Sequence, residues 1–130
     1  MDNLEIARVL KEIGEYLAME EKDSFFRARA YEKAGETVAS FEESLSEIYK
    51  KGGLKALEEI SGVGISIAEK IEELLKTGHS KYYEKLKKKI PVDLSELNRI
   101  EGLGPRGIEK LYEELDITNL KELEKAAKEG

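Results

Sequence analysis

Two glycine-rich turns in this sequence carry the residue types that bind phosphate groups. The first lies between Ile60 and Leu75, where Ile-Ser-Gly-Val-Gly leads directly into apolar residues at helical spacing. Gly62 and Gly64 allow a tight turn and leave no Cβ in the path of a ligand. The first amide N–H groups of a helix have no intrahelical acceptor, so they attract anions, phosphate above all. The stretch therefore predicts an anion-binding turn.

The same arrangement recurs forty residues later, from Ile100 to Leu115, as Ile-Glu-Gly-Leu-Gly-Pro-Arg-Gly followed by a second apolar stripe. A repeated unit of helix, tight turn and helix implies a repeated role, and two such turns suit a polymer with evenly spaced phosphates. The pattern is typical of the helix-hairpin-helix motif. The positions that keep their residue type in both copies are Leu54, Leu57, Ile60, Gly62, Gly64, Glu69, Lys70, Glu73 and Leu75, and then Leu94, Leu97, Ile100, Gly102, Gly104, Glu109, Lys110, Glu113 and Leu115.

Size and composition exclude several classes of protein. The 130 residues suffice for one domain or two small helical ones. The sequence has no cysteine and a single histidine, His79, so disulfide frameworks and thiolate zinc sites are excluded. No apolar run approaches the length of a membrane span, and the N-terminus has no signal-peptide pattern. We expect a soluble, cytoplasmic chain that does not bind membranes.

The formal net charge of −6 argues at first against a nucleic-acid ligand. The charges are segregated, however. Arg27, Arg29 and Lys33 lie close together, and the segment 76–89 holds six lysines against one acidic residue, Glu84. Such patches can face DNA while acidic segments face water. The alternative for any single lysine is an ordinary solvated helix face.

No segment alternates with a period of two, so we expect an all-α chain. A compact N-terminal bundle with the first hairpin would span 1–80, and a second small hairpin domain would span 81–130. The first helix is expected from residue 2 to about residue 19, with Leu4, Ala7, Leu10, Ile13 and Leu17 facing inward. Ser24 would cap a second helix with an inward stripe of Phe26, Ala30, Ala34 and Val38 and an outer face that holds Arg27 and Tyr31.

The remaining helices are marked by capping and stop residues. A short helix over 44–49 should end at the glycine pair 52–53, and the helix after the first turn should stop at Thr77-Gly78. A further helix is expected over 80–90, a capping box at Asp93, and a last helix capped by Thr118. One of Tyr82 and Tyr83 must face the core, and the other could stack on a base. Residues expected in the core or at its edge are Tyr16, Phe25, Phe26, Phe41 and Tyr49.

With this layout the chain resembles the N-terminal region of family X DNA polymerases, the group that includes DNA polymerase beta. The resemblance covers nearly all of the chain and suggests a bacterial or archaeal member. It depends on three segments read together, in this order and at this spacing: Phe26-Arg27-Ala28-Arg29-Ala30-Tyr31-Glu32-Lys33-Ala34, Gly62-Val63-Gly64 with Ile67-Ala68-Glu69-Lys70-Ile71, and Gly102-Leu103-Gly104-Pro105.

The resemblance implies a 5′-phosphate-binding domain of the lyase type, followed by a second hairpin domain that grips DNA without reading its bases. Arg27, Tyr31 and Lys70 would recognise the phosphate. Further contacts would come from backbone amides around Gly62, Val63, Gly64 and Ser66, and around Gly102, Gly104, Arg106 and Gly107. The family also holds a monovalent cation, Na⁺ or K⁺, at each hairpin through backbone carbonyls. These would be the carbonyls of Glu58, Ile60 and Val63, and of Asn98, Ile100 and Leu103.

Polymerase chemistry is not expected from these residues alone. It requires clustered carboxylates that hold Mg²⁺, and the four aspartates here are scattered. The resemblance places the nucleotidyl-transfer residues, with their Mg²⁺, beyond residue 130.

A lyase reaction is the second possibility. Lys70 matches the family's Schiff-base nucleophile for 5′-deoxyribose phosphate, and Arg27 and Lys33 would be cationic neighbours that favour its neutral amine. At three positions where the best-known lyases carry a histidine and two lysines, this sequence has Phe26, Ser66 and Tyr82.

Three hypotheses follow. The first is a monomeric DNA-binding region of a repair polymerase, nucleoid-associated in a prokaryote, which engages gapped or nicked DNA or junctions of single and double strands. The second is an active 5′-deoxyribose phosphate lyase that uses Lys70. The third is a helical adaptor whose hairpins pack against another protein.

Overall fold

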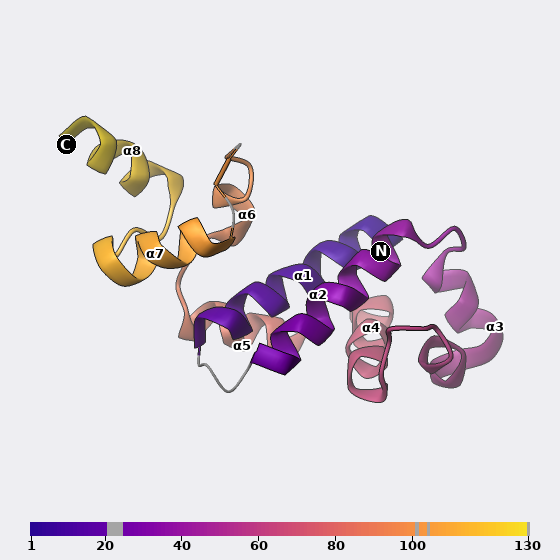
Figure 1. The fold of residues 1–130 in the computed structure, drawn as a ribbon. Coiled ribbons are helices and arrows are strands. Elements are labelled where there is room, and N and C mark those ends of the chain that lie inside the picture. The colour runs from indigo at the N-terminus through magenta and orange to yellow at the C-terminus, as the bar shows by residue number, and fades with distance from the viewer. Residues whose placement is uncertain (21–24, 101, 104, 130) are drawn as a thin grey trace. The chain divides into compact units, whose positions relative to one another are not determined.

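The computed structural model describes residues 1–20, 25–100, 102–103 and 105–129. Within these residues the chain forms helices and no strand, which confirms the predicted all-α class (Figure 1). The predicted cap Ser24 and the second-turn residue Gly104 lie outside the described residues. The helices are α1 (Asn3–Glu20), α2 (Phe25–Ser40), α3 (Leu45–Glu58), α4 (Ile65–Thr77), α5 (Lys81–Lys89), α6 (Leu94–Leu97), α7 (Pro105–Leu115) and α8 (Leu120–Glu129).

The chain divides into two compact units, Met1–Leu86 and Lys87–Gly130. The first unit holds α1 to α4 and most of α5, and the second holds α6 to α8. Each unit contains one of the two glycine-rich turns. The domain limits at 80 and 81 that the sequence suggests stay a prediction.

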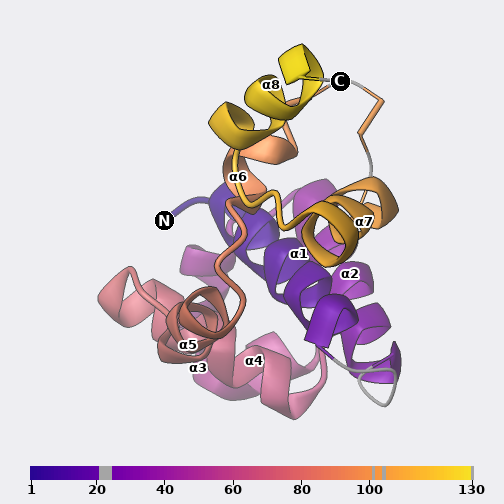
Figure 2. The same cartoon turned by 90° about the vertical axis from the view of Figure 1, so that its left-hand side faces the viewer.

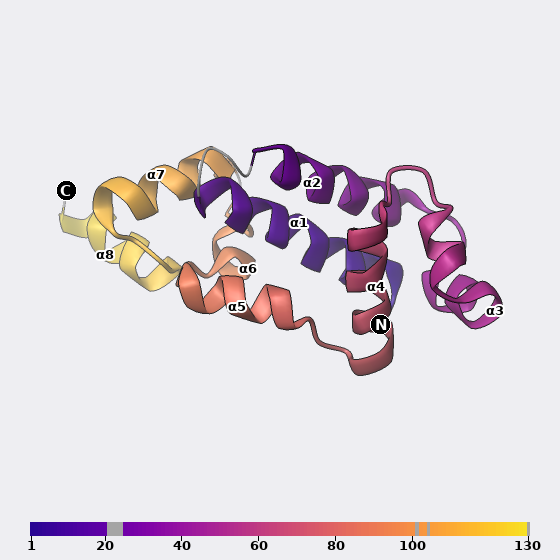
Figure 3. The same cartoon turned by 90° about the horizontal axis from the view of Figure 1, so that it is seen from below.

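Two glycines set the packing of α1 on α2, which lie side by side in Figures 1 and 3. A Cβ atom on Gly14 would lie 2.9 Å from the carbonyl oxygen of Ala28, and one on Gly35 would lie 3.1 Å from that of Ala7. Because backbone sits this close to both positions, no larger residue fits without moving the helices apart. The side chains buried between these and the neighbouring helices include Ile6, Leu10, Ile13, Leu17, Ala34 and Val38.

This packing corrects the predicted orientation of α2. Ala34 and Val38 are buried as expected, but Ala28 and Tyr31 take the inward positions assigned to Phe26 and Ala30. Phe25 and Phe26 are 58% and 84% exposed, so the prediction that they pack in the core is wrong. The prediction for Leu4 is also wrong, since it is 68% exposed at the start of α1. The short side chain of an alanine fits either face, so close helix approach decided the orientation.

The segment α3–α4 carries the first turn. Gly53, with φ 67°, breaks α3 where the sequence predicted a stop, and the chain then resumes helical structure to Glu58. Tyr49 donates a hydrogen bond to Glu72 (2.8 Å), which ties α3 to α4. The helix α4 runs across the α1–α2 pair (Figures 1 and 3). It ends, as predicted, at Gly78 in the left-handed conformation (φ 77°).

A buried tyrosine anchors α5 to α1. The hydroxyl of Tyr83 lies 3.2 Å from the carboxylate of Glu12, which Arg8 contacts at 2.8 Å. Burial and the negative charge of Glu12 raise the pKa of Tyr83 to about 12. Tyr83 is therefore the core-facing member of the tyrosine pair, and Tyr82 is left half-buried on the other side.

In the second unit, α6 is tied to the connection between α7 and α8 (Figure 2). Asp93 caps α6 by accepting the N–H of Glu96 at 3.0 Å, as predicted, and its own N–H donates to the Thr118 carbonyl at 2.6 Å. The cap of α8 differs from the prediction. Asn119, rather than Thr118, accepts the N–H of Glu122 at 2.8 Å. The core side chains of this unit include Leu94, Leu97, Ile108 and Ile117.

Candidate nucleic-acid interface

The first turn is a tight backbone bend supported by α2. The N–H of Val63 donates to the Ile60 carbonyl at 3.0 Å, and both side chains are buried beneath the turn. Gly62 adopts φ 90°, a conformation that side-chain-bearing residues avoid. A Cβ there would also lie 3.1 Å from Oγ1 of Thr37. The bend therefore requires glycine at this position for two separate reasons.

The end of this turn presents backbone donors to solvent. Gly64 is the N-cap of α4, and the first helical bond is donated by the Ala68 N–H to its carbonyl at 2.9 Å. The N–H groups of residues 65–67 precede that bond, so they lack an intrahelical acceptor. Gly64, Ile65 and Ser66 are exposed, and a Cβ on Gly64 would meet nothing within 4 Å. Packing does not demand this glycine, whereas close approach of a ligand to the backbone would.

The second turn has the same backbone form. The N–H of Leu103 donates to the Ile100 carbonyl at 3.2 Å, and Gly102 is exposed with φ 83°. Arg106 lies in the first turn of α7. A Cβ on Gly107 would lie 2.7 Å from Cδ1 of Leu103, the flexible end of that side chain.

The carbonyls predicted to hold a monovalent cation belong to these two turns. Those of Ile60 and Ile100 each accept one backbone N–H, at 3.0 and 3.2 Å. A carbonyl oxygen has two lone pairs, so each retains capacity for a cation. The others in the two sets are Glu58, Val63, Asn98 and Leu103, which precede or follow the same bends. The donor chemistry fits Na⁺ or K⁺, which take oxygen ligands.

Side chains from three helices converge beside the first turn, around Tyr82 of α5. Arg27 of α2 donates a hydrogen bond from Nη2 to the Tyr82 hydroxyl, and its Cζ lies 5.9 Å from the ring centroid. The Nζ of Lys70, on α4, lies 5.3 Å from the same centroid. Both distances are within cation–π range. Two of the predicted site residues are thus brought to one aromatic ring.

Tyr31 is the buried member of this group of side chains. Its ring stacks on Tyr82 with centroids 6.2 Å apart and planes at 30°, and its side chain is 4% exposed. Burial raises the pKa of Tyr31, as does Tyr82, while a hydrogen bond with the Ser66 side chain and the charge of Arg27 act in the opposite direction. The hydroxyl is therefore neutral and able to donate a hydrogen bond. We call Arg27, Tyr31, Ser66, Lys70 and Tyr82 the α2–α4–α5 cluster.

The sequence identified four members of the cluster but not the role of the fifth. The sequence marks Tyr82 as a replacement for a lysine and as a candidate for stacking on a base, but it carries no sign of the contacts with Arg27, Lys70 and Tyr31. Phe26 lies where the best-known lyases have histidine. It is exposed at the start of α2, and its ring meets that of Phe25 edge-on with the ring centroids 5.8 Å apart.

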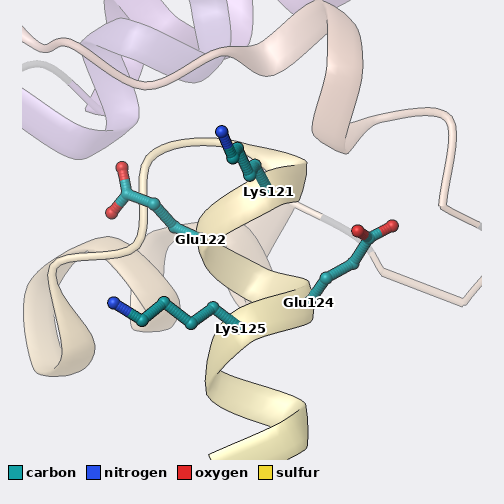
Figure 4. A pocket seen from close by; sticks show the side chains of 4 residues that line it. All are labelled: Lys121, Glu122, Glu124 and Lys125. Carbon is teal, nitrogen blue, oxygen red and sulfur yellow. The ribbon is translucent and has the colours of Figure 1, made fainter.

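Other parts of the described chain offer less for a ligand. Across the ranges that the structure describes, no group of histidine, cysteine or carboxylate side chains is arranged to hold a metal ion, and no helix is both long and apolar enough to cross a membrane. A hollow of about 440 Å³ lies beside α8 (Figure 4). Its lining charges cancel, and the side chains point in different directions: Lys121, Glu122, Glu124 and Lys125.

The fold and the repeated turn define the class of this protein. A family model described as a helix-hairpin-helix domain matches residues 1–80, and the chain belongs to that family. The chain is also 30% identical over 129 residues to the DNA polymerase/3′-5′ exonuclease PolX of Bacillus subtilis (strain 168). The similarity covers 99% of this chain, which spans only 21% of the relative's length. The predicted resemblance to the N-terminal region of a family X polymerase is confirmed.

Proposed function

We propose that this chain binds DNA independently of base sequence, as a monomer, through the backbone of its two glycine-rich turns. Both turns are exposed at their described glycines, and the first ends in helix amides without intrahelical acceptors. Such donors suit the phosphates of a nucleic-acid strand and carry no information about bases. Similarity to a protein named as a DNA polymerase supports the same ligand and, in a prokaryote, a place at the nucleoid.

The first unit further recognises the 5′-phosphate at a gap or nick. The observation that carries this proposal is the convergence of Arg27 and Lys70 on one ring beside the α4 N-terminus. A terminal phosphate bears more negative charge than an internal phosphodiester. Two cations, the hydroxyls of Tyr31 and Ser66, and the helix amides are the groups that such a ligand requires.

Titration of labelled gapped duplexes tests both parts. One duplex carries a 5′-phosphate at the gap and the other a 5′-hydroxyl, and each is measured from low to moderate salt. We expect binding that weakens steeply with salt, is indifferent to sequence and is tighter for the phosphorylated duplex. Equal affinity for the two duplexes would contradict 5′-phosphate recognition. No detectable binding to either would contradict DNA binding itself and favour the protein adaptor.

A 5′-deoxyribose phosphate lyase is a second candidate function, and one observation favours it. The Lys70 amine shares the Tyr82 ring with Arg27, so a nucleophile lies within the same cluster that would hold the phosphate. Attack of this amine, in its neutral form, on the open-chain aldehyde would form a Schiff base with loss of water, and β-elimination from the sugar would then release the phosphate. Borohydride should then trap a covalent adduct on an incised abasic duplex. Absence of the adduct, or its persistence in Lys70→Ala, would remove Lys70 as the nucleophile.

The hairpin carbonyls would hold a monovalent cation, Na⁺ or K⁺, when the chain binds DNA. At the first turn these are the carbonyls of Glu58, Ile60 and Val63. At the second they are those of Asn98, Ile100 and Leu103. When bound, the cation would supply positive charge beside the backbone donors of each turn. Mg²⁺ belongs to the polymerase reaction and has no proposed role in this chain.

A further inference from the structure

Tyr82 contacts three of the side chains to which 5′-phosphate recognition is assigned, each in a different way. Its hydroxyl accepts a hydrogen bond from Arg27, its ring lies 5.3 Å from the Lys70 ammonium, and it stacks on Tyr31. The three partners come from two helices, and Tyr82 itself comes from a third. The relative placement of Arg27 and Lys70 therefore depends on this one side chain.

The ring restrains two flexible cations before a ligand arrives. Arginine and lysine side chains lose much rotamer freedom when they bind, and this loss weakens binding. Arg27 is exposed and Lys70 is half-buried, so neither side chain is held in place by full burial. Contact with one ring aims both charges at a common point and reduces the entropy lost on binding.

The hydroxyl of Tyr82 gains a donor role from its bond with Arg27. Because it accepts the guanidinium N–H, its own hydrogen points away from Arg27 and can be donated to another acceptor. A phenol polarised by a neighbouring cation is a stronger donor than one in water. A terminal phosphate has three non-bridging oxygens, one for each of Arg27, Lys70 and Tyr82, whereas an internal phosphodiester has two.

We propose that Tyr82 is the specificity-determining residue of this site, which selects a terminal phosphate over an internal phosphodiester by donating one hydrogen bond and by aligning Arg27 with Lys70. This inference rests on the proposed recognition of a 5′-phosphate and assigns its selectivity to a tyrosine instead of a third cation. The two contributions are separable because phenylalanine keeps the ring and loses the hydroxyl, whereas leucine loses both.

The test compares affinities for gapped duplexes with a 5′-phosphate and with a 5′-hydroxyl, and takes their ratio as the phosphate preference. Tyr82→Phe should lower the preference about tenfold, the effect of one hydrogen bond to a charged group, with little change for the 5′-hydroxyl duplex. Tyr82→Leu should lower it further. Tyr49→Phe is the matched control, since its hydroxyl bonds to Glu72 away from the cluster, and it should keep the wild-type ratio.

The outcomes distinguish this inference from the proposal on which it rests. Thermal unfolding of each variant, compared with that of the wild type, establishes that the variants are folded. A wild-type preference that survives in both Tyr82→Phe and Tyr82→Leu would overturn the role of Tyr82 and leave 5′-phosphate binding intact. A wild type with no preference would refute 5′-phosphate recognition itself, and the role of Tyr82 with it.

Discussion

The two glycine-rich turns share a backbone and differ in what surrounds it. In each turn, a backbone N–H donates to the carbonyl of the isoleucine three residues earlier. The first glycine of each turn has a similar positive φ, 90° at Gly62 and 83° at Gly102. The first turn lies against Thr37 of α2, whereas a Cβ on Gly102 would meet nothing within 4 Å.

The lysines at equivalent positions after the two turns also differ in their surroundings. Lys70 is half-buried beside Tyr82, and Lys110 is exposed on α7. The feature that repeats is therefore the main-chain turn, which suits binding to any phosphate of a nucleic-acid strand. The added element is a set of side chains from α2 and α5, present beside the first turn, which suits one particular phosphate. A Glu-Lys pair after the turn is common to both copies and does not by itself indicate chemistry.

The largest expected effect comes from removing the cations of the first unit. Arg27→Ala combined with Lys70→Ala should reduce the phosphate preference by roughly ten- to a hundredfold, the range for hydrogen bonds to charged groups. Lys110→Ala, the equivalent change in the second unit, should lower the affinity for both gapped duplexes slightly and by the same factor. The measurement is fluorescence anisotropy at fixed salt. An equal loss of preference in Lys110→Ala would break the distinction between the turns.

High pH should weaken the first unit through its buried tyrosine. Burial and Glu12 raise the pKa of Tyr83 from 10.0 to about 12, so the folded state favours the neutral phenol. Its contribution to the free energy of unfolding, at most about 3 kcal/mol, is complete below pH 10 and is lost as the pH rises towards 12.

Urea unfolding between pH 10 and 12 measures this loss. Tyr83→Phe should remove this part of the pH dependence, because phenylalanine does not titrate. Tyr112→Phe in the second unit is the matched control and should retain it. A Tyr83→Phe profile that falls as steeply as the wild type would rule out this tyrosine as the cause.

The two positive-φ glycines should tolerate alanine differently. Gly102→Ala should lower the free energy of unfolding by about 1–2 kcal/mol for backbone strain alone. Gly62→Ala should cost more, because its Cβ would also lie 3.1 Å from Oγ1 of Thr37. Adding Thr37→Ala to Gly62→Ala should recover the difference in thermal or urea unfolding. If the two single variants are equally stable, the support of the first turn by α2 has no energetic weight.

The smallest expected effect tests the monovalent-cation sites that are proposed for both turns. Replacing K⁺ by tetramethylammonium at constant ionic strength should weaken DNA binding roughly two- to fivefold, the scale of weak exposed ionic contacts. The phosphate preference should stay the same, since the cation sites belong to both turns and the preference belongs to the cluster. Unchanged affinity would argue against cations at the Ile60 and Ile100 carbonyls.

Much of the fold was readable from local chemistry. Gly53 places a break, Gly62 and Gly102 place the two turns, and Gly78 and Asp93 mark helix ends, all through backbone rules that act over a few residues. The orientation of α2 was not readable, because its alanines fit either face and the choice depends on close contact at Gly14 and Gly35 on two helices. At the start of α8, Thr118 and Asn119 are both good caps, and the sequence could not choose between them.

The candidate site was predicted in part for the same reason. Spacing and resemblance identified Arg27, Tyr31, Ser66 and Lys70. The structure places Arg27, Tyr31 and Lys70 around the Tyr82 ring, and Ser66 hydrogen-bonds to Tyr31. Tyr83 is anchored to α1 by Glu12 and Tyr16, and the adjacent Tyr82 then contacts α2 and α4. A contact that depends on three helices has no local signature.

Amide NMR of the full chain with gapped DNA tests the central claim most directly. With a 5′-hydroxyl duplex, the amides of Gly64 and Gly102 should both shift, because both turns contact the strand. Changing to a 5′-phosphate duplex should shift the amides of Gly64 and Ser66 further and leave Gly102 where it was. The claim is that both turns bind DNA and that only the first recognises the 5′-phosphate. Shifts confined to other surfaces, or an equal response of the two turns to the added phosphate, would contradict it.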